Sequence, residues 1–454
     1  MNALGAAGCA RLAPAADPCH AALRGQDPMQ LTASADLREF YEKYPYPCFD
    51  EDLGDMLAGR QVVIGNPRHW HNMYFPSRPP AERLDVLVAG CGTREAARLA
   101  AGSPAARIAG IDLSEASLAE TRRLKTKHGL DNLELRQLAL EDAAELDRDF
   151  DLIFCSGVLH HLEDPLAGFA ALRGVLRRGG AMNIMLYGRY GRLGIDMLRE
   201  ILRRAGARCG EAGIAEARRW FWSLPRQNPF RDSLLRLNDI NYDSGVADLL
   251  LHPRERSFAV PEIYEFLARS GLVLQRFLCQ AHYKPRCSAI AADPVLLERT
   301  QSLPPSEQYA ITELLRGDIK KHVFIACRDD RPVAEYAIDF SGEDWRRFVP
   351  IRNPGLEASR DNLPPAGIAR LRWAVHDYPE IAAVVDDNQA RLFDLVNGER
   401  TIAEIVAASA ITGVAAGPGE YARNFFESMW DFDYFWFRKP TGAGGPGRAP
   451  ESMS

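Results

Sequence analysis

The chain has 454 residues, of which 46% are hydrophobic and 26% charged, and its formal net charge is −6. This length favours two or more domains, and the composition is typical of a soluble globular protein. The negative charge argues against a protein that binds nucleic acid through phosphate contacts. No apolar run approaches the roughly 18–20 residues that cross a bilayer, so we predict neither a nucleic-acid nor a membrane partner.

The nine cysteines show no CxxC spacing, and their odd number fits no disulfide framework. We therefore predict neither a disulfide scaffold nor a metal site. Reduced cysteines are typical of a cytoplasmic protein, and we expect that localisation. The first 30 residues are rich in Ala, Pro and Gly and lack the apolar stretch of a secretory signal, which predicts a disordered leader over 1–30.

A short helical pattern covers 36–43 and ends at Tyr44-Pro45-Tyr46-Pro47, because a proline disfavours helical geometry in the residue before it. A polar connecting stretch then leads to Arg83. We therefore expect 31–83 to form an N-terminal helix and a connecting segment.

Strands and helices alternate from residue 84 to residue 187. This alternation predicts βαβ units and a parallel sheet whose sites lie at the carboxyl ends of its strands. Ser114 and Asp164 are expected to begin the second and third helices, and Gly179-Gly180 to end the third. The expected strands are 84–89, 107–112, 132–138, 150–155 and 181–187, and the expected helices are 94–101, 114–128 and 165–177.

The alternation breaks at 188–257, which we expect to be a helical insertion that covers the substrate, since loops on a rigid scaffold carry specificity. It resumes with a helix from Val260 and with strands over 272–278 and 322–327, so we expect one domain over 84–328. Arginines of the insertion could bind an acidic substrate or form a solvated helix face; they are Arg192, Arg199, Arg203, Arg204, Arg218 and Arg219.

The character of the chain changes beyond residue 330. Helices are expected over 388–407 around Asn397-Gly398, and Thr401-x-x-Glu404 has the pattern of a capping box. We expect a small C-terminal domain over 329–438 and a disordered Gly/Pro/Ser-rich tail over 439–454.

Two glycines and an acid point to a cofactor. The apolar run 84–89 leads into Gly90-Cys91-Gly92, and the next strand ends at Asp112. Glycine permits a tight turn and the close approach of a ligand, and an acid at this place can accept both hydroxyls of a ribose. The pattern predicts a site for an adenosine-containing cofactor.

Glu95 helps to choose between adenosine cofactors. Dinucleotide enzymes place a third glycine at this position, and an acid at the helix N-terminus would repel a pyrophosphate. S-adenosylmethionine has no pyrophosphate, so the motif favours this cofactor. An NAD-dependent oxidoreductase remains an alternative.

The segment Ser156 to Pro165 after the fourth strand, and Leu176 to Ala181 before the fifth, complete a pattern that resembles the class I S-adenosylmethionine-dependent methyltransferases. The resemblance covers 84–187, and 260–328 is similar to the last two strands of the family. It implies an α/β fold with a Rossmann-like seven-stranded sheet and helices on both faces. The C-terminal domain resembles a small winged-helix segment.

The resemblance also implies roles for single residues. Gly90 and Gly92 form the turn beside the methionine part, and Asp112 binds the ribose. Val88, Arg94 and Ala139 depart from the family pattern, in which an acid, a glycine and an acid are common. The implied cofactor-binding residues are Gly90, Cys91, Gly92, Asp112, Leu113, Leu140, Glu141, Ser156 and Gly157.

His160 and His161 are candidate general bases, because histidine titrates near neutrality and this loop faces the site in the family. The alternative is that one histidine caps the next helix or supports the loop.

The Tyr-Pro-Tyr-Pro segment resembles one that precedes the sheet in a group of bacterial methyltransferases. Its aromatic rings either close over the sulfonium or only pack on the sheet.

These observations predict a methyltransferase that moves a methyl group from S-adenosylmethionine to a small molecule or to a peptide or protein. The C-terminal segment favours a peptide partner, because similar pieces accompany some protein methyltransferases; the alternative is a domain that only packs or forms a homodimer. A non-catalytic binding protein on the same fold is the main alternative function.

Overall fold

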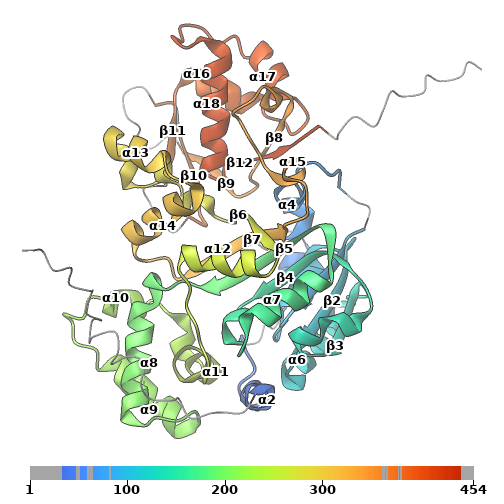
Figure 1. Cartoon of the computed structure of the whole chain (residues 1–454), viewed down its shortest axis with the longest axis vertical. Helices are drawn as coiled ribbons and strands as arrows, with labels where there is room; N and C mark the ends of the chain where they lie inside the picture. Colours follow the sequence, from blue (N-terminus) through green and yellow to red (C-terminus); the bar gives the residue numbers. More distant parts are fainter. Residues whose placement is uncertain are drawn as a thin grey trace, which may run out of the picture.

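The computed structural model describes residues 33–47, 52–58, 65–80, 83–359, 363, 367–376, 378 and 381–440. The leader predicted over 1–30 and the predicted tail from residue 441 lie outside the described residues. A large sheet with its helices lies at the centre, the insertion at one end and a C-terminal domain at the other (Figure 1). Among the described residues, every helix is too short or too polar to traverse a lipid bilayer.

The central sheet has the strand order β3-β2-β1-β4-β5-β7-β6, and β7 runs antiparallel to both of its neighbours. This topology confirms the predicted α/β fold with a Rossmann-like seven-stranded sheet. The strands are β1 (Asp85–Ala89), β2 (Arg107–Asp112), β3 (Leu133–Gln137), β4 (Phe150–Ser156), β5 (Leu176–Tyr187), β6 (Leu272–Phe277) and β7 (Lys321–Arg328).

Helices cover both faces of the sheet, as predicted (Figure 1). Leu99 of α5 and Leu118 of α6 belong to one hydrophobic cluster, and Phe169 of α7 and Ile263 of α12 belong to the cluster on the other face. The helices that accompany the central sheet outside the insertion are α5 (Glu95–Gly102), α6 (Glu115–His128), α7 (Pro165–Gly174), α12 (Val260–Arg269), α13 (Pro294–Gln301) and α14 (Pro305–Arg316).

The predicted helix starts are confirmed, but one predicted helix end is wrong. Ser114 accepts a hydrogen bond from the Ser117 amide, and Asp164 accepts one from the Leu166 amide. The third helix ends at Gly174, and Gly180 lies inside β5. A Cβ at Gly180 would lie 2.9 Å from the Asp151 carbonyl oxygen, so the glycine permits close strand approach rather than ending the helix.

The N-terminal segment contains more structure than its polar sequence predicts. Besides α2 (Ala33–Lys43) it holds the short α3 (Gly54–Leu57) and α4 (Pro67–Tyr74). Asn66 caps α4 by accepting from the Arg68 amide, and Pro67 takes the first helical position. The ring centroid of Trp70 lies 4.5 Å from that of Trp436, so α4 connects the sheet to the C-terminal domain.

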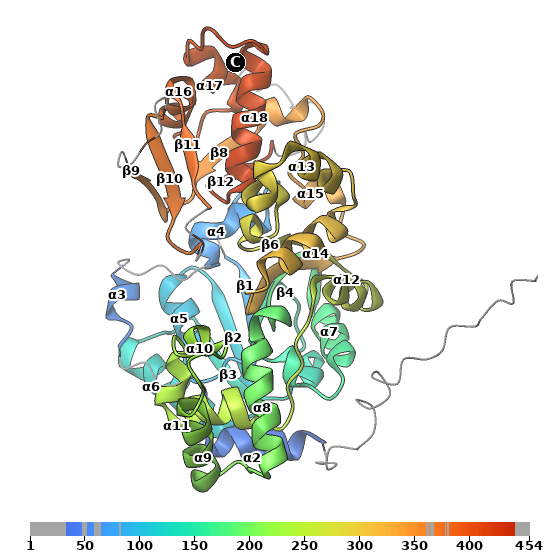
Figure 2. The same cartoon turned by 90° about the vertical axis from the view of Figure 1, so that its left-hand side faces the viewer.

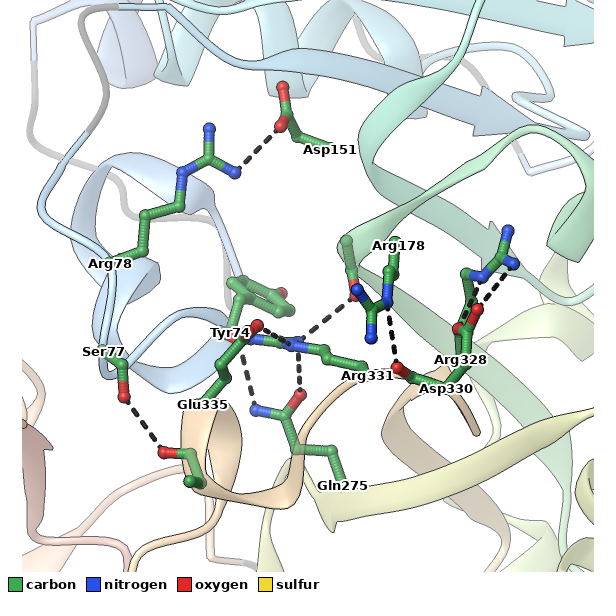
Figure 3. Close-up of polar contacts among 12 residues, drawn as sticks. Tyr74, Ser77, Arg78, Asp151, Arg178, Gln275, Arg328, Asp330, Arg331 and Glu335 are labelled. Carbon is green, nitrogen blue, oxygen red and sulfur yellow. Dashed lines mark hydrogen bonds and ion pairs between the residues drawn. The ribbon is translucent and has the colours of Figure 1, made fainter. Parts of the chain in front are cut away.

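Arg331 holds α4 against the sheet, at the edge opposite the carboxyl ends of the parallel strands (Figure 3). Its guanidinium donates to the Gly180 and Gln275 oxygens at 3.3 Å each and to the Tyr74 carbonyl at 3.2 Å. The Gln275 amide donates in turn to the Met73 carbonyl at 2.8 Å. This polar junction stabilises the scaffold away from the glycine turn.

The insertion is helical, as predicted, and packs on α2. Phe40 and Tyr44 share a hydrophobic cluster with Leu198 and Phe221 of the insertion, and Figures 1 and 2 place α2 beside it. The helices of the insertion are α8 (Leu193–Ala205), α9 (Glu211–Trp222), α10 (Arg231–Leu234), α11 (Asp243–Val246) and a π-helix, η5 (Ala247–Leu251).

The described part of the C-terminal region combines four α-helices with two small sheets. The predicted capping box is confirmed, since the Thr401 hydroxyl accepts from the Glu404 amide and the Glu404 carboxylate accepts from the Thr401 amide. The elements are α15 (Val333–Tyr336), β8 (Val349–Arg352), β9 (Leu356–Ser359), β10 (Ala369–Trp373), β11 (Ala383–Val385), α16 (Asp387–Leu395), α17 (Ile402–Ala408), α18 (Gly417–Asp431) and β12 (Phe435–Arg438).

Candidate active site

The turn after β1 has the tight geometry that its glycines predict. Gly90 and Gly92 adopt φ values of 68° and 55°, which favour glycine, and the Gly90 and Cys91 amides both donate to the Ile111 carbonyl at 2.9 Å. A Cβ at Gly92 would lie 2.7 Å from the Tyr46 carbonyl oxygen. The turn therefore brings the end of β1, the end of β2 and the N-terminal segment together.

Asp112 ends β2 beside this turn. Its two carboxylate oxygens accept hydrogen bonds from the Gly92 amide at 2.8 Å and from the Ser114 amide at 2.9 Å. Burial raises the pKa of Asp112, and these amide bonds oppose that rise. Each oxygen keeps a further lone pair, so the carboxylate is oriented and can still accept two ribose hydroxyls.

A cavity of about 370 Å³ opens at the carboxyl ends of the parallel strands, a volume within the range of small-molecule sites. All the residues predicted to bind the cofactor line this cavity. They are Gly90, Cys91, Gly92, Asp112, Leu113, Leu140, Glu141, Ser156 and Gly157. Their individual contacts with a cofactor remain predictions.

The Tyr-Pro-Tyr-Pro segment lies over the glycine turn. Tyr46 and Pro47 line the cavity, and the Thr93 hydroxyl donates to the Pro47 carbonyl at 2.7 Å. The preceding helix α2 is held by Glu42, whose carboxylate accepts from the first two amides of α6 at 2.6 and 3.0 Å. The segment therefore covers the end of the cavity that is formed by residues 90–92 and 112–113, which we call the donor end. Contact of its rings with a sulfonium remains a prediction.

The other end of the cavity, which we call the insertion end, is lined by His161, Tyr187, Asp248 and Lys321. Asp248 belongs to the π-helix η5, and the Tyr41 hydroxyl donates to its carboxylate at 3.2 Å. Burial raises the pKa of Asp248 to about 7, and the nearby Glu255 adds to the rise. Lys321 is an exposed residue at the start of β7 that lines the cavity, and loss of hydration there lowers the pKa of its ammonium.

Asp248 and Lys321 were not predicted from the sequence. Asp248 is a single acid within the apolar run 246–251, and a buried acid in such a run needs a partner or a function. That signal could have identified it. Lys321 begins a strand after another lysine and has no comparable signal in the sequence.

The structure separates the two candidate histidines. His161 lines the cavity, whereas His160 is not among the lining residues and packs with its ring centroid 4.0 Å from that of Tyr187. The Nδ1 of His161 donates to the Arg254 carbonyl at 2.7 Å, which leaves the lone pair on Nε2. Burial lowers the pKa of His161 to about 4, so the imidazole is neutral near pH 7. The catalytic role predicted for either histidine remains a prediction.

Five of the six candidate arginines of the insertion pair with its acids, and Arg219 forms no ion pair with the described residues. Arg192 and Arg199 pair with the buried Glu255, with N–O distances of 2.6 and 3.5 Å. The guanidinium of Arg192 also lies 3.5 Å from the centroid of the Tyr187 ring. Arg203 and Arg204 pair with Glu200, and Arg218 with Asp243. These contacts favour a structural role over direct binding of an acidic substrate.

Comparison with known proteins defines the class. A methyltransferase-domain family model matches residues 87–182, the part of the chain that holds the glycine turn and Asp112. Among solved structures, PKMT2 from Rickettsia typhi has a similar fold, with a TM-score of 0.60 and 16% identity over 87% of this chain and 78% of that one. The same protein in complex with AdoHcy gives a TM-score of 0.59. The family model and the fold together define a class I S-adenosylmethionine-dependent methyltransferase domain in this chain.

Two kinds of relatives extend this result. A protein of Synechococcus sp. described as uncharacterized is 33% identical over 344 residues, which are 72% of this chain and 79% of that protein. The chain belongs to the same family as this protein. A tRNA U34 carboxymethyltransferase of Shewanella sp. is 33% identical over 108 residues, only 24% of this chain and 32% of the relative.

Proposed function

We propose that this protein transfers the methyl group of S-adenosylmethionine, by direct displacement, to a small molecule or to a peptide or protein in the cytoplasm. The arrangement of Asp112 carries the proposal, because two amides orient its carboxylate at the mouth of the glycine turn. That geometry suits the paired hydroxyls of a ribose. The proposed partners include neither a membrane nor a nucleic acid.

We assign the residues that line the cavity to separate parts of S-adenosylmethionine. Gly90 and Gly92 let the backbone approach the methionine part, and Leu113 with Leu140 and Glu141 surround the adenine. Ser156 and Gly157, at the end of β4, lie beside the methyl group. Most of the rate acceleration then comes from alignment of nucleophile, methyl carbon and sulfur, and from exclusion of water under Tyr46 and the insertion.

The test is a transfer screen with methyl-labelled S-adenosylmethionine, using cell extract and purified peptides as acceptor sources. We expect label in a product with the wild-type protein and its loss with Asp112→Ala. Transfer that survives this substitution undiminished would contradict the ribose assignment. Absence of both S-adenosylmethionine binding and transfer in the wild type would favour a non-catalytic binding protein.

Carboxymethyl transfer is a second candidate, and Lys321 favours it. A carboxymethyl group carries a carboxylate that needs a cation near the reacting carbon. Lys321 places an ammonium in the cavity, and no carboxylate of the described residues lies within ion-pair distance of it. The tRNA carboxymethyltransferases align with only a quarter of the chain, so methyl transfer remains our first choice.

Product mass distinguishes the two candidates. A methylated acceptor gains the mass of one methylene, whereas a carboxymethylated acceptor gains in addition the mass of carbon dioxide. Lys321→Met should leave methyl transfer to an uncharged acceptor within about threefold of wild type, but should strongly reduce carboxymethyl transfer, because the transferred carboxylate loses its cation. Retention of a carboxymethylated product in this variant would exclude the proposed role of Lys321.

A further inference from the structure

Asp248 is a buried carboxylate at the insertion end of the cavity, away from the ribose site. The residue is 3% exposed and lines the same cavity as Ser156 and Gly157. One oxygen, Oδ1, accepts from the Tyr41 hydroxyl at 3.2 Å. Among the described residues no donor reaches the other oxygen, Oδ2. A carboxylate of this kind can take a proton from a molecule held in the cavity.

Building on the proposed methyl transfer, we propose that Asp248 is the base that takes the proton of the acceptor, which is therefore a hydroxyl or an N–H amine. The nucleophile's lone pair forms the new bond to the methyl carbon. The carbon–sulfur bond breaks with its electron pair going to sulfur, which gives S-adenosylhomocysteine. The acceptor's proton moves to Asp248 Oδ2 and reaches solvent when product leaves.

The surroundings of Asp248 suit this role. Burial and the negative charge of Glu255 raise its pKa to about 7, and Asp239 acts in the same direction. The hydrogen bond from Tyr41 and the positive charge of Arg192 lower the pKa of Asp248, so the carboxylate can ionise near neutral pH. The titratable and charged groups that face it are Tyr41 of α2, Tyr46, His161, Tyr187 of β5, Arg192, Asp239, His252, Glu255 and Lys321 of β7.

Helix α2 links this carboxylate to the cofactor end. The Tyr41 side chain donates to Asp248, while the Tyr41 carbonyl accepts from the Ser114 hydroxyl at 3.1 Å. The Ser114 amide in turn donates to Asp112. Tyr41 is therefore a positioning residue, because it fixes Asp248 relative to Asp112, the acid proposed to bind the ribose.

His161 is the competing base in the same cavity. Because burial lowers its pKa to about 4, its neutral imidazole attracts a proton weakly at pH 7. The neighbouring His252, whose ring centroid lies 3.9 Å from that of His161, is also held neutral by burial, which lowers its pKa. These differences favour Asp248 as the proton acceptor.

The first test is the pH profile of labelled-methyl transfer to the acceptor found in cell extract. The wild-type rate should rise with pH and level off above about pH 7 as Asp248 ionises. Asp248→Asn should transfer roughly 100-fold more slowly, with a residual rate that keeps rising with pH, while S-adenosylmethionine affinity stays within about threefold. The matched control is Asp243→Asn, an exposed acid of the same insertion, which should keep the wild-type profile.

A second measurement needs no acceptor. Asp248 has a raised pKa in the folded state, so its ionisation costs stability, which is lost as pH rises through that pKa. The melting temperature of Asp248→Asn relative to wild type should therefore increase between about pH 4 and pH 7 and stay constant above that range. A difference that does not change with pH would overturn the proposal.

Two further results would also overturn it. One is Asp248→Asn with the wild-type rate and profile. The other is His161→Gln, rather than Asp248→Asn, abolishing the inflection near neutral pH. Failure of the proposed function is separate, because it appears as a wild-type protein that does not bind S-adenosylmethionine in calorimetry while the melting difference at Asp248 persists.

Discussion

The donor end of the cavity is built from residues 90–92 and 112–113, whereas the insertion end is built from residues 161, 187, 248 and 321. The donor end is formed by β1, the glycine turn and α5 together with the neighbouring strand β2, and the local sequence specifies each of these elements. The insertion end needs α2, η5 and β7 to meet after the whole domain has folded. The cofactor site therefore depends on the central sheet and its turns, whereas the choice of acceptor depends on the segments packed onto the sheet, α2 and the insertion.

The largest expected effect concerns the donor end. Asp112→Ala removes the ribose-binding acid and leaves the Gly92 and Ser114 amides without their acceptor. We expect S-adenosylmethionine affinity to fall roughly 100-fold, the cost of a pair of charge-assisted hydrogen bonds. Calorimetry checks this, with the exposed Asp131→Ala as a control that keeps wild-type affinity. Equal S-adenosylmethionine affinities of Asp112→Ala and Asp131→Ala would contradict the assignment of cofactor binding to the donor end.

A smaller effect is expected at the glycine turn. A methyl group at Gly92 would contact the Tyr46 carbonyl at 2.7 Å, so Gly92→Ala must displace the covering segment. We expect about tenfold weaker S-adenosylmethionine binding and a loss of about 1–2 kcal/mol in the free energy of unfolding.

Gly129→Ala is the matched control for this change. Gly129 has a similar φ of 61°, but a Cβ there would meet nothing within 4 Å. This variant should lose stability through backbone strain alone, by about 1 kcal/mol, and keep its cofactor affinity. Comparable losses of affinity in both glycine variants would show that contact with Tyr46 is unimportant.

The smallest expected effect on cofactor affinity is at His160. Because it is buried against Tyr187 rather than lining the cavity, His160→Ala should lower the free energy of unfolding by about 2 kcal/mol and leave S-adenosylmethionine affinity unchanged. Chemical denaturation and calorimetry on the same variant provide both values. A large loss of affinity at constant stability would place His160 in the site.

The sequence predicted the sheet and the donor end well, for identifiable reasons. Strand patterns, capping residues such as Ser114 and the two glycines act within a few residues of each other, so their signals are local. Helix α4 was missed because its apolar residues, such as Trp70, face the distant C-terminal domain. Asp248 and Lys321 were missed because only tertiary packing brings them to one cavity, although the isolation of Asp248 in an apolar run was a readable signal.

A crystal structure of the protein with S-adenosylhomocysteine tests the central claim most directly. We expect the ligand to fill the cavity, with both ribose hydroxyls bound to Asp112 and the sulfur turned toward Ser156 and the Asp248 carboxylate. An empty cavity at saturating S-adenosylhomocysteine would contradict the account. A ligand with its adenine at the Asp248 end would contradict it equally.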